Sequence, residues 1–252
     1  MQILLVGYGA MGGALLKGWE PFHNITVVDP FKEGCASSLE DLPPTYTPDV
    51  VVVAIKPQML EEVMPTYVRF RYALFISIAA GVKSERYLTW LGAKARVSRV
   101  MPNLPVLVAR GASAYVLNEN CTPADDMIVS NLFAKVGLVE KLAHEDLFDA
   151  VTALSGSGPA YVYYLCECLE QAGIELGLDP QFSKRFARQT IIGAAATLKE
   201  LATPPAELRA NVTSKGGTTE AALGVLMQEN QLKNLFLAAL KAAHKRAQEL
   251  AL

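Results

Sequence analysis

Long hydrophobic runs are the first thing that this sequence of 252 residues lacks. The longest strongly apolar run covers residues 50–55, far short of the roughly 18 residues that a membrane-spanning helix needs. The N-terminal residues also lack the basic region and small-residue cleavage site of a secretory signal, and they lead directly into a glycine motif. We therefore expect no transmembrane segment and a cytoplasmic protein.

Cysteine and histidine are scarce as well. The four cysteines form no C-x-x-C pair, and the last two stand two residues apart in a helical pattern, which points them in different directions. All four are expected to be reduced, buried thiols: Cys35, Cys121, Cys166 and Cys168. The three histidines have no metal-ligand spacing. The sequence therefore predicts neither a metal site nor a catalytic histidine.

An excess of charge of one sign is also absent. Lys and Arg total 23, Asp and Glu total 25, and the net charge is −2. This balance leaves no electrostatic signature for a nucleic acid or an anionic membrane. Apolar residues make up 51% and charged residues 19%, which excludes a disordered chain. The length allows one or two domains.

The first 150 residues contain short β-branched runs that alternate with helical patterns. Strands are predicted near residues 3–6, 25–28, 50–55, 74–78, 96–100, 112–117 and 138–141, and helices near 11–19, 58–64, 84–91 and 125–134. This βαβ pattern is typical of a parallel sheet covered on both faces. We predict an α/β fold of the Rossmann type over residues 1–150, doubly wound and mostly parallel, with about eight strands and the last of them antiparallel.

A change of period marks a second, all-helical domain over residues 151–252. No β-rich run follows residue 150, and apolar spacing becomes helical. Helices are predicted near 158–178, 180–201, 219–228 and 232–250, with a short one after 205, and Asp179 and Pro180 are the expected N-cap and first residue of the second. Five helices make a small, flat module that is more easily stabilised by pairing with a copy of itself.

A glycine motif follows the first predicted strand and opens the first predicted helix. It consists of Gly7, Tyr8, Gly9, Ala10, Met11 and Gly12. In this context a G-x-G-x-x-G pattern predicts a dinucleotide site. Gly7 permits the tight turn, Gly9 lets the pyrophosphate approach the backbone, and Gly12 lets the helix pack on the strand. A purely structural glycine turn is the alternative.

Asp29 ends the second predicted strand, about 20 residues after Gly9. A carboxylate there can accept both hydroxyls of an adenosine ribose and would repel a 2′-phosphate, which favours NAD over NADP. A plain Asp29-Pro30 turn is the alternative, and Lys32 could offset the repulsion.

Further segments end at the same edge of the predicted sheet. Lys56-Pro57 follows the run 50–55, so its ammonium is expected to face a cofactor at the carboxyl edge. Residues 79–81 and 101–105 close the next two strands. Two prolines around Asn103 stiffen its loop, and its amide could contact a nicotinamide or serve the turn alone. The pattern leaves both interpretations open.

Two segments rich in glycine and hydroxyl side chains precede helices of the second domain. Residues 155–159 are expected to join the domains and cap the long helix. Residues 213–219 make the better small-anion site, because glycines leave the amides open and a helix N-terminus favours a carboxylate. A plain capped turn is the alternative.

Together these segments resemble the pyrroline-5-carboxylate reductase family, over essentially the whole chain. The matching stretches are residues 7–12, 54–57, 77–81, 101–103, 155–161 and 212–219, of which the last two are specific to the family. The resemblance implies hydride transfer from NAD(P)H to 1-pyrroline-5-carboxylate, giving L-proline in the last step of proline biosynthesis. It also implies a homo-oligomer, at least a dimer through the helical domain. The expected binding partner is this small-molecule substrate, and no nucleic acid or membrane is expected to bind.

Site residues are carried over from the resemblance by position. The substrate residues are Ser214, Gly216, Gly217, Thr218 and Thr219, where the first three hold the carboxylate and Thr219 hydrogen-bonds near the imine nitrogen. The cofactor residues beyond the glycine motif and Asp29 are Ala54, Lys56, Pro57, Ala80, Met101 and Asn103. Lys56 and Thr219 are the expected catalytic residues.

The sequence departs from the usual family pattern at three positions. Leu104 stands where Thr is usual, Lys215 stands where Pro is frequent, and Asp29 replaces a neutral residue in a family that often prefers NADPH. Two other classes would also fit a dinucleotide domain followed by helices. A β-hydroxyacid dehydrogenase would carry a Lys on the helix at 158–178, which has none. A non-catalytic dinucleotide sensor would have no need of the carboxylate site.

Overall fold

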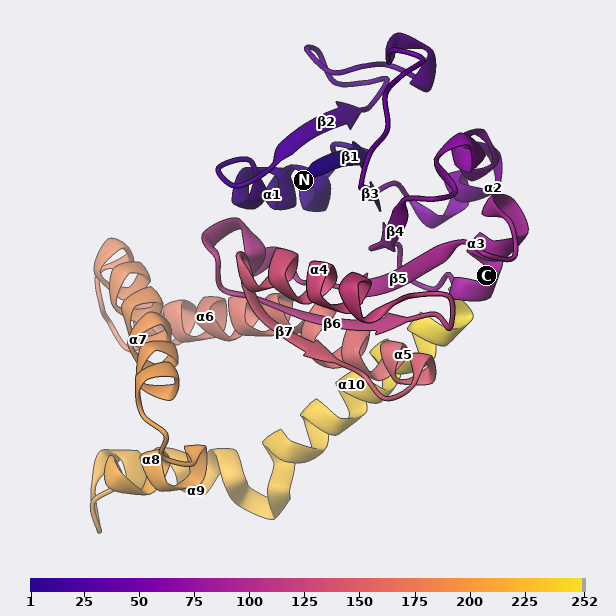
Figure 1. The fold of residues 1–252 in the computed structure, drawn as a ribbon. Helices are drawn as coiled ribbons and strands as arrows, with labels where there is room; N and C mark the ends of the chain where they lie inside the picture. Colours follow the sequence, from indigo (N-terminus) through magenta and orange to yellow (C-terminus); the bar gives the residue numbers. More distant parts are fainter. Residues whose placement is uncertain (251–252) are drawn as a thin grey trace. The chain divides into compact units, whose positions relative to one another are not determined.

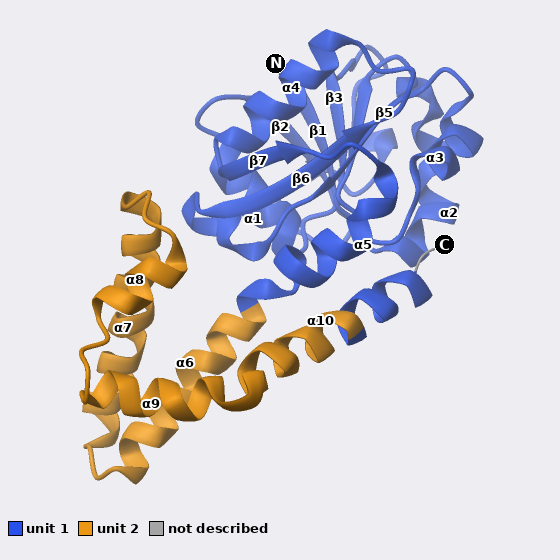
Figure 2. Cartoon of the chain, turned by 90° about the horizontal axis from the view of Figure 1, so that it is seen from below, with its two compact units in different colours: residues 1–159, 242–252 blue, residues 160–241 orange. Residues whose placement is uncertain are grey.

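The computed structural model describes residues 1–250, and the chain divides into two compact units (Figure 2). Unit 1 holds Met1–Pro159 together with the C-terminal segment from Ala242, and unit 2 holds Ala160–Lys241. The domain boundary predicted at residue 151 lies in a helical stretch after the last strand and stays a prediction.

Unit 1 is built on a sheet with the strand order β2-β1-β3-β4-β5-β6-β7 (Figure 1). The strands are β1 (Gln2–Val6), β2 (Asn24–Val28), β3 (Val50–Val53), β4 (Leu74–Ser77), β5 (Arg96–Met101), β6 (Gly111–Leu117) and β7 (Gly137–Lys141). The first five are parallel, β6 is antiparallel to β5, and β7 is parallel to β6. The mostly parallel sheet with reversed last strands is thus confirmed.

The expected number of about eight strands is wrong, because the described residues form a sheet of seven. Each β-branched run gave one strand, and after Lys141 the chain enters helical turns. The strand order reverses between β1 and β3: β2 follows β1 on one side, and β3 and the later strands follow on the other side. In open α/β sheets a ligand binds at such a point, beyond the carboxyl ends of the strands.

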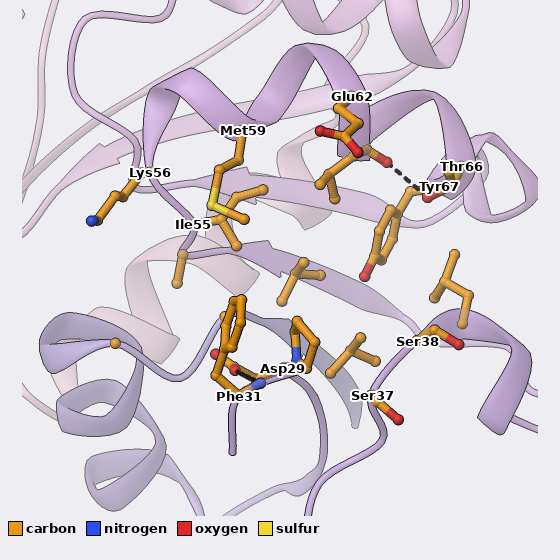
Figure 3. A pocket seen from close by; sticks show the side chains of 18 of the residues that line it. Asp29, Phe31, Ser37, Ser38, Ile55, Lys56, Met59, Glu62, Thr66 and Tyr67 are labelled. Atoms are coloured by element: carbon orange, nitrogen blue, oxygen red, sulfur yellow. Dashed lines mark hydrogen bonds between the residues drawn. The ribbon is translucent and has the colours of Figure 1, made fainter.

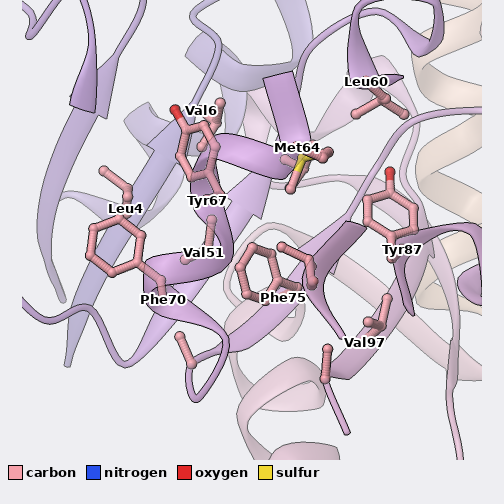
Figure 4. Close-up of a cluster of buried hydrophobic side chains, with 14 of the residues drawn as sticks. Leu4, Val6, Val51, Leu60, Met64, Tyr67, Phe70, Phe75, Tyr87 and Val97 are labelled. Atoms are coloured by element: carbon pink, nitrogen blue, oxygen red, sulfur yellow. The ribbon is translucent and has the colours of Figure 1, made fainter. Parts of the chain in front are cut away.

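Both faces of this sheet are buried. All four valines of β3 have no exposed surface, and they alternate between two hydrophobic clusters. Val51 and Val53 belong to the cluster drawn in Figure 4, where Phe75 and Tyr87 also lie. The opposite cluster includes Trp19 and residues of the fourth helix. This alternation is what a strand with helices on both sides requires.

Four of the five α-helices before α6 lie at predicted positions, and the short α5 was not predicted. The five are α1 (Ala10–Trp19), α2 (Leu60–Val63), α3 (Ser84–Leu91), α4 (Pro123–Ala134) and α5 (Phe148–Val151). The helix predicted near 58–64 is shorter than expected, because only α2 is α-helical and 3-10 turns at Pro57–Met59 and Met64–Phe70 flank it. Pro65 lacks the N–H that would continue an α-helix, so the helix ends before it.

Five helices follow, as predicted: α6 (Gly158–Glu175), α7 (Pro180–Glu200), α8 (Pro205–Asn211), α9 (Thr218–Met227) and α10 (Gln231–Glu249). The Asp179 carboxylate accepts from the Phe182 N–H and caps α7, with Pro180 in its first turn. The segment 155–159, expected to join the domains and cap the long helix, is helical apart from a bend at Ser157, because a π-helical turn at Thr152–Gly156 precedes α6. None of the described helices is long and apolar enough to cross a membrane.

The helices of unit 2 bury few side chains. Of the residues in α6 to α10 only Ser183 and Ala187 are buried. All four cysteines are free thiols, but the expectation that they are buried is wrong: Cys168 is exposed and the other three are half-buried. Leu165 and Tyr164 on α6 are 45% and 66% exposed. Many apolar side chains of these helices are therefore largely exposed within the described chain.

Candidate functional site

The glycine motif has the geometry of a dinucleotide-binding turn. Gly7 has a φ of +98°, which side chains rarely tolerate. A Cβ on Gly12 would lie 2.3 Å from the Gly7 carbonyl oxygen, so only glycine allows α1 to start this close to the turn. A Cβ on Gly9 would meet nothing within 4 Å, which leaves the backbone open on that side. Gly9 is also the N-cap of α1 and provides no side-chain cap.

A cavity of about 560 Å³ lies next to this turn (Figure 3). Its lining comes from the ends of β1, β2 and β3 and from the segments that follow them: Gly7, Gly9, Asp29, Pro30, Phe31, Ser37, Ser38, Ala54, Ile55, Lys56, Met59 and Tyr67 are among the lining residues. The structure thus brings together Gly7, Gly9, Asp29, Ala54 and Lys56, which the sequence had placed in one cofactor site. The cavity sits at the reversal of strand order between β1 and β3.

Asp29 both forms a turn and lines the cavity. Its Oδ2 accepts from the Tyr8 N–H at 2.6 Å, and its Oδ1 accepts from the Phe31 N–H at 2.8 Å. The first bond ties the end of β2 to the glycine motif. Each oxygen keeps a second lone pair, so the carboxylate can still accept a hydroxyl from a ligand.

Lys56 and Tyr67 lie on the opposite wall of the cavity. Lys56 precedes the 3-10 turn before α2, and Tyr67 belongs to the 3-10 turn after it. Lys56 is exposed, and in Figure 3 its ammonium points away from Asp29 and Phe31. The hydroxyl of Tyr67 points into the cavity in the same view. Burial raises the pKa of the Tyr67 phenol, so at neutral pH it is a neutral hydrogen-bonding group.

A loop beside the cavity holds its own carboxylate. Asp41 Oδ2 accepts from the backbone N–H groups of Ser37 and Ser38 and from the Ser37 hydroxyl. The side-chain hydrogen bond from Ser37, followed by the backbone bonds from Ser38 and Ser37, lowers the pKa of Asp41. The two backbone N–H groups and the Ser37 hydroxyl are therefore occupied by a charged group of the chain itself.

Several expected cofactor residues do not line this cavity. Ala80 is exposed after β4, Met101 is buried at the end of β5, and Pro57 borders a separate groove with Glu61 and Arg86. Tyr8, Ala10 and Met11 belong to the glycine turn and α1 without being part of the cavity wall.

Asn103 uses its side-chain amide within the chain. The Nδ2 group donates to the backbone oxygen of Ser155 at 3.1 Å, and Oδ1 accepts from the Ala112 N–H at 2.8 Å. Asn103 thus has a structural role within the chain, and its expected contact with a nicotinamide stays a prediction.

The predicted anion site lies in unit 2, before α9. Gly216 has a φ of +71°, and Gly217 is the N-cap of α9. A Cβ on Gly217 would lie 2.4 Å from Ser214 Oγ and 3.0 Å from the Ser214 carbonyl oxygen, so a side chain there would displace the Ser214 hydroxyl. The Gly216 N–H donates to Glu220 Oε2 at 2.6 Å. Within the described chain, one of the amides expected to hold a substrate carboxylate therefore binds the carboxylate of Glu220.

The side-chain hydroxyls expected to bind the substrate differ in their solvent exposure. Thr218 and Ser214 are exposed, and Thr219 is half-buried. Lys215 is exposed as well, and it adds a positive charge to this segment. The Gly217 N–H also has a partner, because it donates to the Ser214 carbonyl at 3.0 Å. What the segment offers a small carboxylate is therefore its exposed hydroxyls and the N-terminus of α9.

One buried group escaped the sequence interpretation. Arg99, in the middle of β5, is 4% exposed and pairs with Glu145 at 2.7 Å. An Arg inside the apolar run of β5 was a usable signal that some carboxylate must lie opposite. The identity of that carboxylate could not be read from the sequence, because 46 residues separate the two partners.

Comparisons with known proteins cover the whole chain. A family model described as pyrroline-5-carboxylate reductase dimerisation matches residues 145–250. A pyrroline-5-carboxylate reductase of Pseudomonas aeruginosa is 36% identical over 99% of this chain and 97% of its own length. The enzyme of that name from Glycine max is 39% identical over 80% of this chain and 73% of its own.

Solved structures agree with the sequence relatives. A pyrroline-5-carboxylate reductase from Coxiella burnetii superimposes with a TM-score of 0.90 at 34% identity and covers 99% of this chain and 98% of its own. A pyrroline carboxylate reductase from Plasmodium falciparum, solved with NADP bound, has a TM-score of 0.88 at 30% identity and covers 100% of this chain and 98% of its own.

Proposed function

Because the chain belongs to the pyrroline-5-carboxylate reductase family, we propose that it reduces 1-pyrroline-5-carboxylate to L-proline, the last step of proline biosynthesis. The observation that carries this proposal is the similarity to a reductase of that name over 99% of the chain. The glycine turn with the cavity beside it, and the exposed hydroxyls at the N-terminus of α9, supply the two binding functions that such a reaction needs.

The residues of unit 1 fit a nicotinamide dinucleotide. Gly9 leaves the backbone open, α1 presents an uncapped N-terminus to a pyrophosphate, and Asp29 can accept ribose hydroxyls within the cavity. We place the adenosine half of the dinucleotide in this cavity and the nicotinamide half toward Ala80 and Met101. When bound, the reduced cofactor supplies a hydride, which adds to the C5 carbon of the imine.

Residues of unit 2 bind the substrate. Ser214, Gly216 and Gly217 hold its carboxylate, and the Thr219 hydroxyl hydrogen-bonds near the imine nitrogen. A protonated imine is already a strong electrophile, so the chain needs chiefly to hold the ring in register and exclude water. Lys56, with its exposed ammonium at the cavity rim, acts on the cofactor side.

Cofactor preference follows from charge. Asp29 places a carboxylate beside the expected ribose, and Asp41 occupies the backbone N–H groups of Ser37 and Ser38 and the Ser37 hydroxyl. A 2′-phosphate would meet these negative charges, so we propose that NADH is preferred to NADPH, although a relative binds NADP.

Assembly and location complete the proposal. The helices α6 to α10 expose apolar side chains, and the matching family model is one of dimerisation, so a homodimer through these helices is proposed. The cytoplasmic location and the lack of nucleic-acid and membrane partners stay predictions.

The test is a kinetic assay of the purified protein. Oxidation of NADH and of NADPH is followed at a series of 1-pyrroline-5-carboxylate concentrations, and proline is identified as the product. Turnover with a higher kcat/KM for NADH supports both parts of the proposal. A protein that binds NADH but yields no proline with either cofactor would contradict the reaction, and a higher kcat/KM for NADPH would contradict the cofactor preference.

A further inference from the structure

A buried ion pair lies in unit 1, away from the cavity beside Asp29. Arg99 Nη1 lies 2.7 Å from Glu145 Oε1, and the guanidinium carbon lies 4.4 Å from the ring centroid of Phe148. The Arg99 Nε is buried and has no hydrogen-bond partner in the chain. A charge buried in the middle of a sheet is costly unless it is paired. Arg99 therefore depends on Glu145.

Glu145 joins β5 to the start of α3. Its Oε1 also accepts from the Ser84 N–H at 2.8 Å, and its Oε2 accepts from the Ser84 hydroxyl at 2.8 Å. The N-cap residue of α3, Lys83, makes no side-chain cap, so Glu145 takes over this task from a distant segment. Burial alone would raise the pKa of Glu145, but the hydrogen bonds from Arg99 and Ser84 outweigh it and lower the pKa.

The pair is connected to a turn at the end of β4. Ser84 comes three residues after Gly81, whose φ is +74°. Gly81, Arg99 and Glu145 line a common cavity of about 290 Å³, together with Phe148. By fixing the first residue of α3, Glu145 fixes the chain that leads from the Ala80-Gly81 turn into that helix.

The same pair is connected to Met101. Arg99 and Met101 are two residues apart on β5, so their side chains lie on the same face of the sheet. Phe148 packs in one cluster with Met101 and Val116, while its ring also lies under the Arg99 guanidinium. A loss of the ion pair would release Phe148 and with it one wall of the Met101 environment.

We propose that Arg99 and Glu145 are positioning residues for the nicotinamide half of the dinucleotide site. They hold the Ala80-Gly81 turn and Met101 in place without touching the cofactor, and this inference rests on the proposed function. Neither residue lines the cavity assigned to the adenosine half. Their effect is therefore confined to one end of the cofactor.

The test compares two ligands that differ at this end. ADP-ribose carries the adenosine half and both phosphates but no nicotinamide, so the ratio of the NADH and ADP-ribose affinities reports the nicotinamide contacts alone. The double variant Arg99→Met/Glu145→Leu removes the pair without leaving a buried charge, a replacement that ion pairs often tolerate in stability. In this variant we expect an unchanged affinity for ADP-ribose, an NADH affinity reduced to that of ADP-ribose, and a kcat lowered by roughly ten- to a hundredfold.

Two further variants separate positioning from stability. In Glu145→Gln the single side-chain oxygen can still accept from Arg99 and the Ser84 N–H, while the amide NH2 can donate to the Ser84 hydroxyl, which then acts as the acceptor. The affinity ratio should therefore stay near that of the unmodified protein, even where the melting temperature falls. Arg96→Met is the matched control on the same strand, because Arg96 pairs with the buried Asp125 at 2.6 Å, at the opposite end of β5. It should lower the melting temperature and leave the affinity ratio unchanged.

The possible results decide the inference in either direction. The inference is overturned if the double variant keeps the affinity ratio, or if its affinities for NADH and ADP-ribose fall in parallel. The pair would then have a purely structural role. The inference is also overturned if the ratio of the NADH and ADP-ribose affinities falls in Arg96→Met as much as in the double variant. The ligand titrations need no turnover, so they decide the role of Arg99 and Glu145 even if the protein yields no proline, an outcome that would contradict only the proposed reaction.

Discussion

Asp29 shows how one carboxylate can serve both the fold and a ligand. It accepts the Tyr8 and Phe31 N–H groups and still faces the cavity beside the glycine turn. The two alternatives posed by the sequence, a plain turn and a ribose ligand, are therefore compatible with each other.

Asp29→Ser is expected to shift the cofactor preference toward NADPH. Removal of the charge next to the ribose removes its repulsion of a 2′-phosphate, so the NADPH to NADH ratio of kcat/KM should rise by about ten- to a hundredfold. Glu40→Gln is the control, since Glu40 lines the same cavity but is not the strand-end carboxylate. The preference argument fails if the ratio is the same in Asp29→Ser and in the unmodified protein.

Glu220 is a second carboxylate with a consequence at the residue scale. Its bond to the Gly216 N–H competes with any substrate carboxylate for the same donor. In Glu220→Ala we expect the KM for 1-pyrroline-5-carboxylate to fall by about twofold to fivefold. This range corresponds to the free energy that an exposed charge contributes near a helix end. Steady-state kinetics at saturating NADH measure this effect, and Glu207→Ala on α8 is the control. A raised KM would show that Glu220 helps to form the site.

At the scale of elements, α1 depends on two adjacent glycines in different ways. A Cβ at Gly12 would overlap the Gly7 carbonyl, whereas a Cβ at Gly13 would meet only the Tyr8 ring at 3.4 Å. The first glycine is required by packing, and the second occupies a helix position that alanine would suit better.

Gly12→Ala should therefore destabilise the protein by about 1–3 kcal/mol and abolish NADH binding, because the turn and the helix must separate. Gly13→Ala should keep NADH binding and gain about 0.5–1 kcal/mol. Chemical denaturation and fluorescence titration measure both quantities. Equal effects of the two substitutions would show that the close approach of α1 to Gly7 does not matter.

The elements also show what local sequence can and cannot predict. β3 was predictable because four consecutive valines favour a strand buried on both faces. The flanks of α2 were not, since Pro65 turns an apolar helical pattern into 3-10 turns. Asn103 illustrates the same limit for the site: its bonds to Ser155 and Ala112 depend on how β6 and the π-helical turn fold back on its loop.

For the whole molecule, the glycine turn and Asp29 could be placed together from strand order and spacing alone. The Arg99–Glu145 pair could not, because its partners meet only through the sheet register and the helical segment after β7. Long-range pairs of this kind follow from tertiary packing and leave little trace in local patterns.

Exposed apolar side chains on α6 lead to a prediction about assembly. Leu165→Glu should convert the proposed dimer into a monomer, because a charge would be buried in the contact between copies. Leu107→Glu is a matched control, as Leu107 is 44% exposed against 45% for Leu165 and lies outside the dimerisation match. Light scattering on a sizing column measures the masses. A dimer that survives Leu165→Glu would move the interface elsewhere.

The sparse burial within α6 to α10 has a thermodynamic consequence. Helices that bury only Ser183 and Ala187 among themselves gain little free energy from folding alone. If a second copy supplies the missing contacts, folding and association form one equilibrium governed by mass action. The melting temperature should then rise with protein concentration, and dilution should inactivate the protein by melting these helices. For such a chain, the amount made in the cell sets its stability.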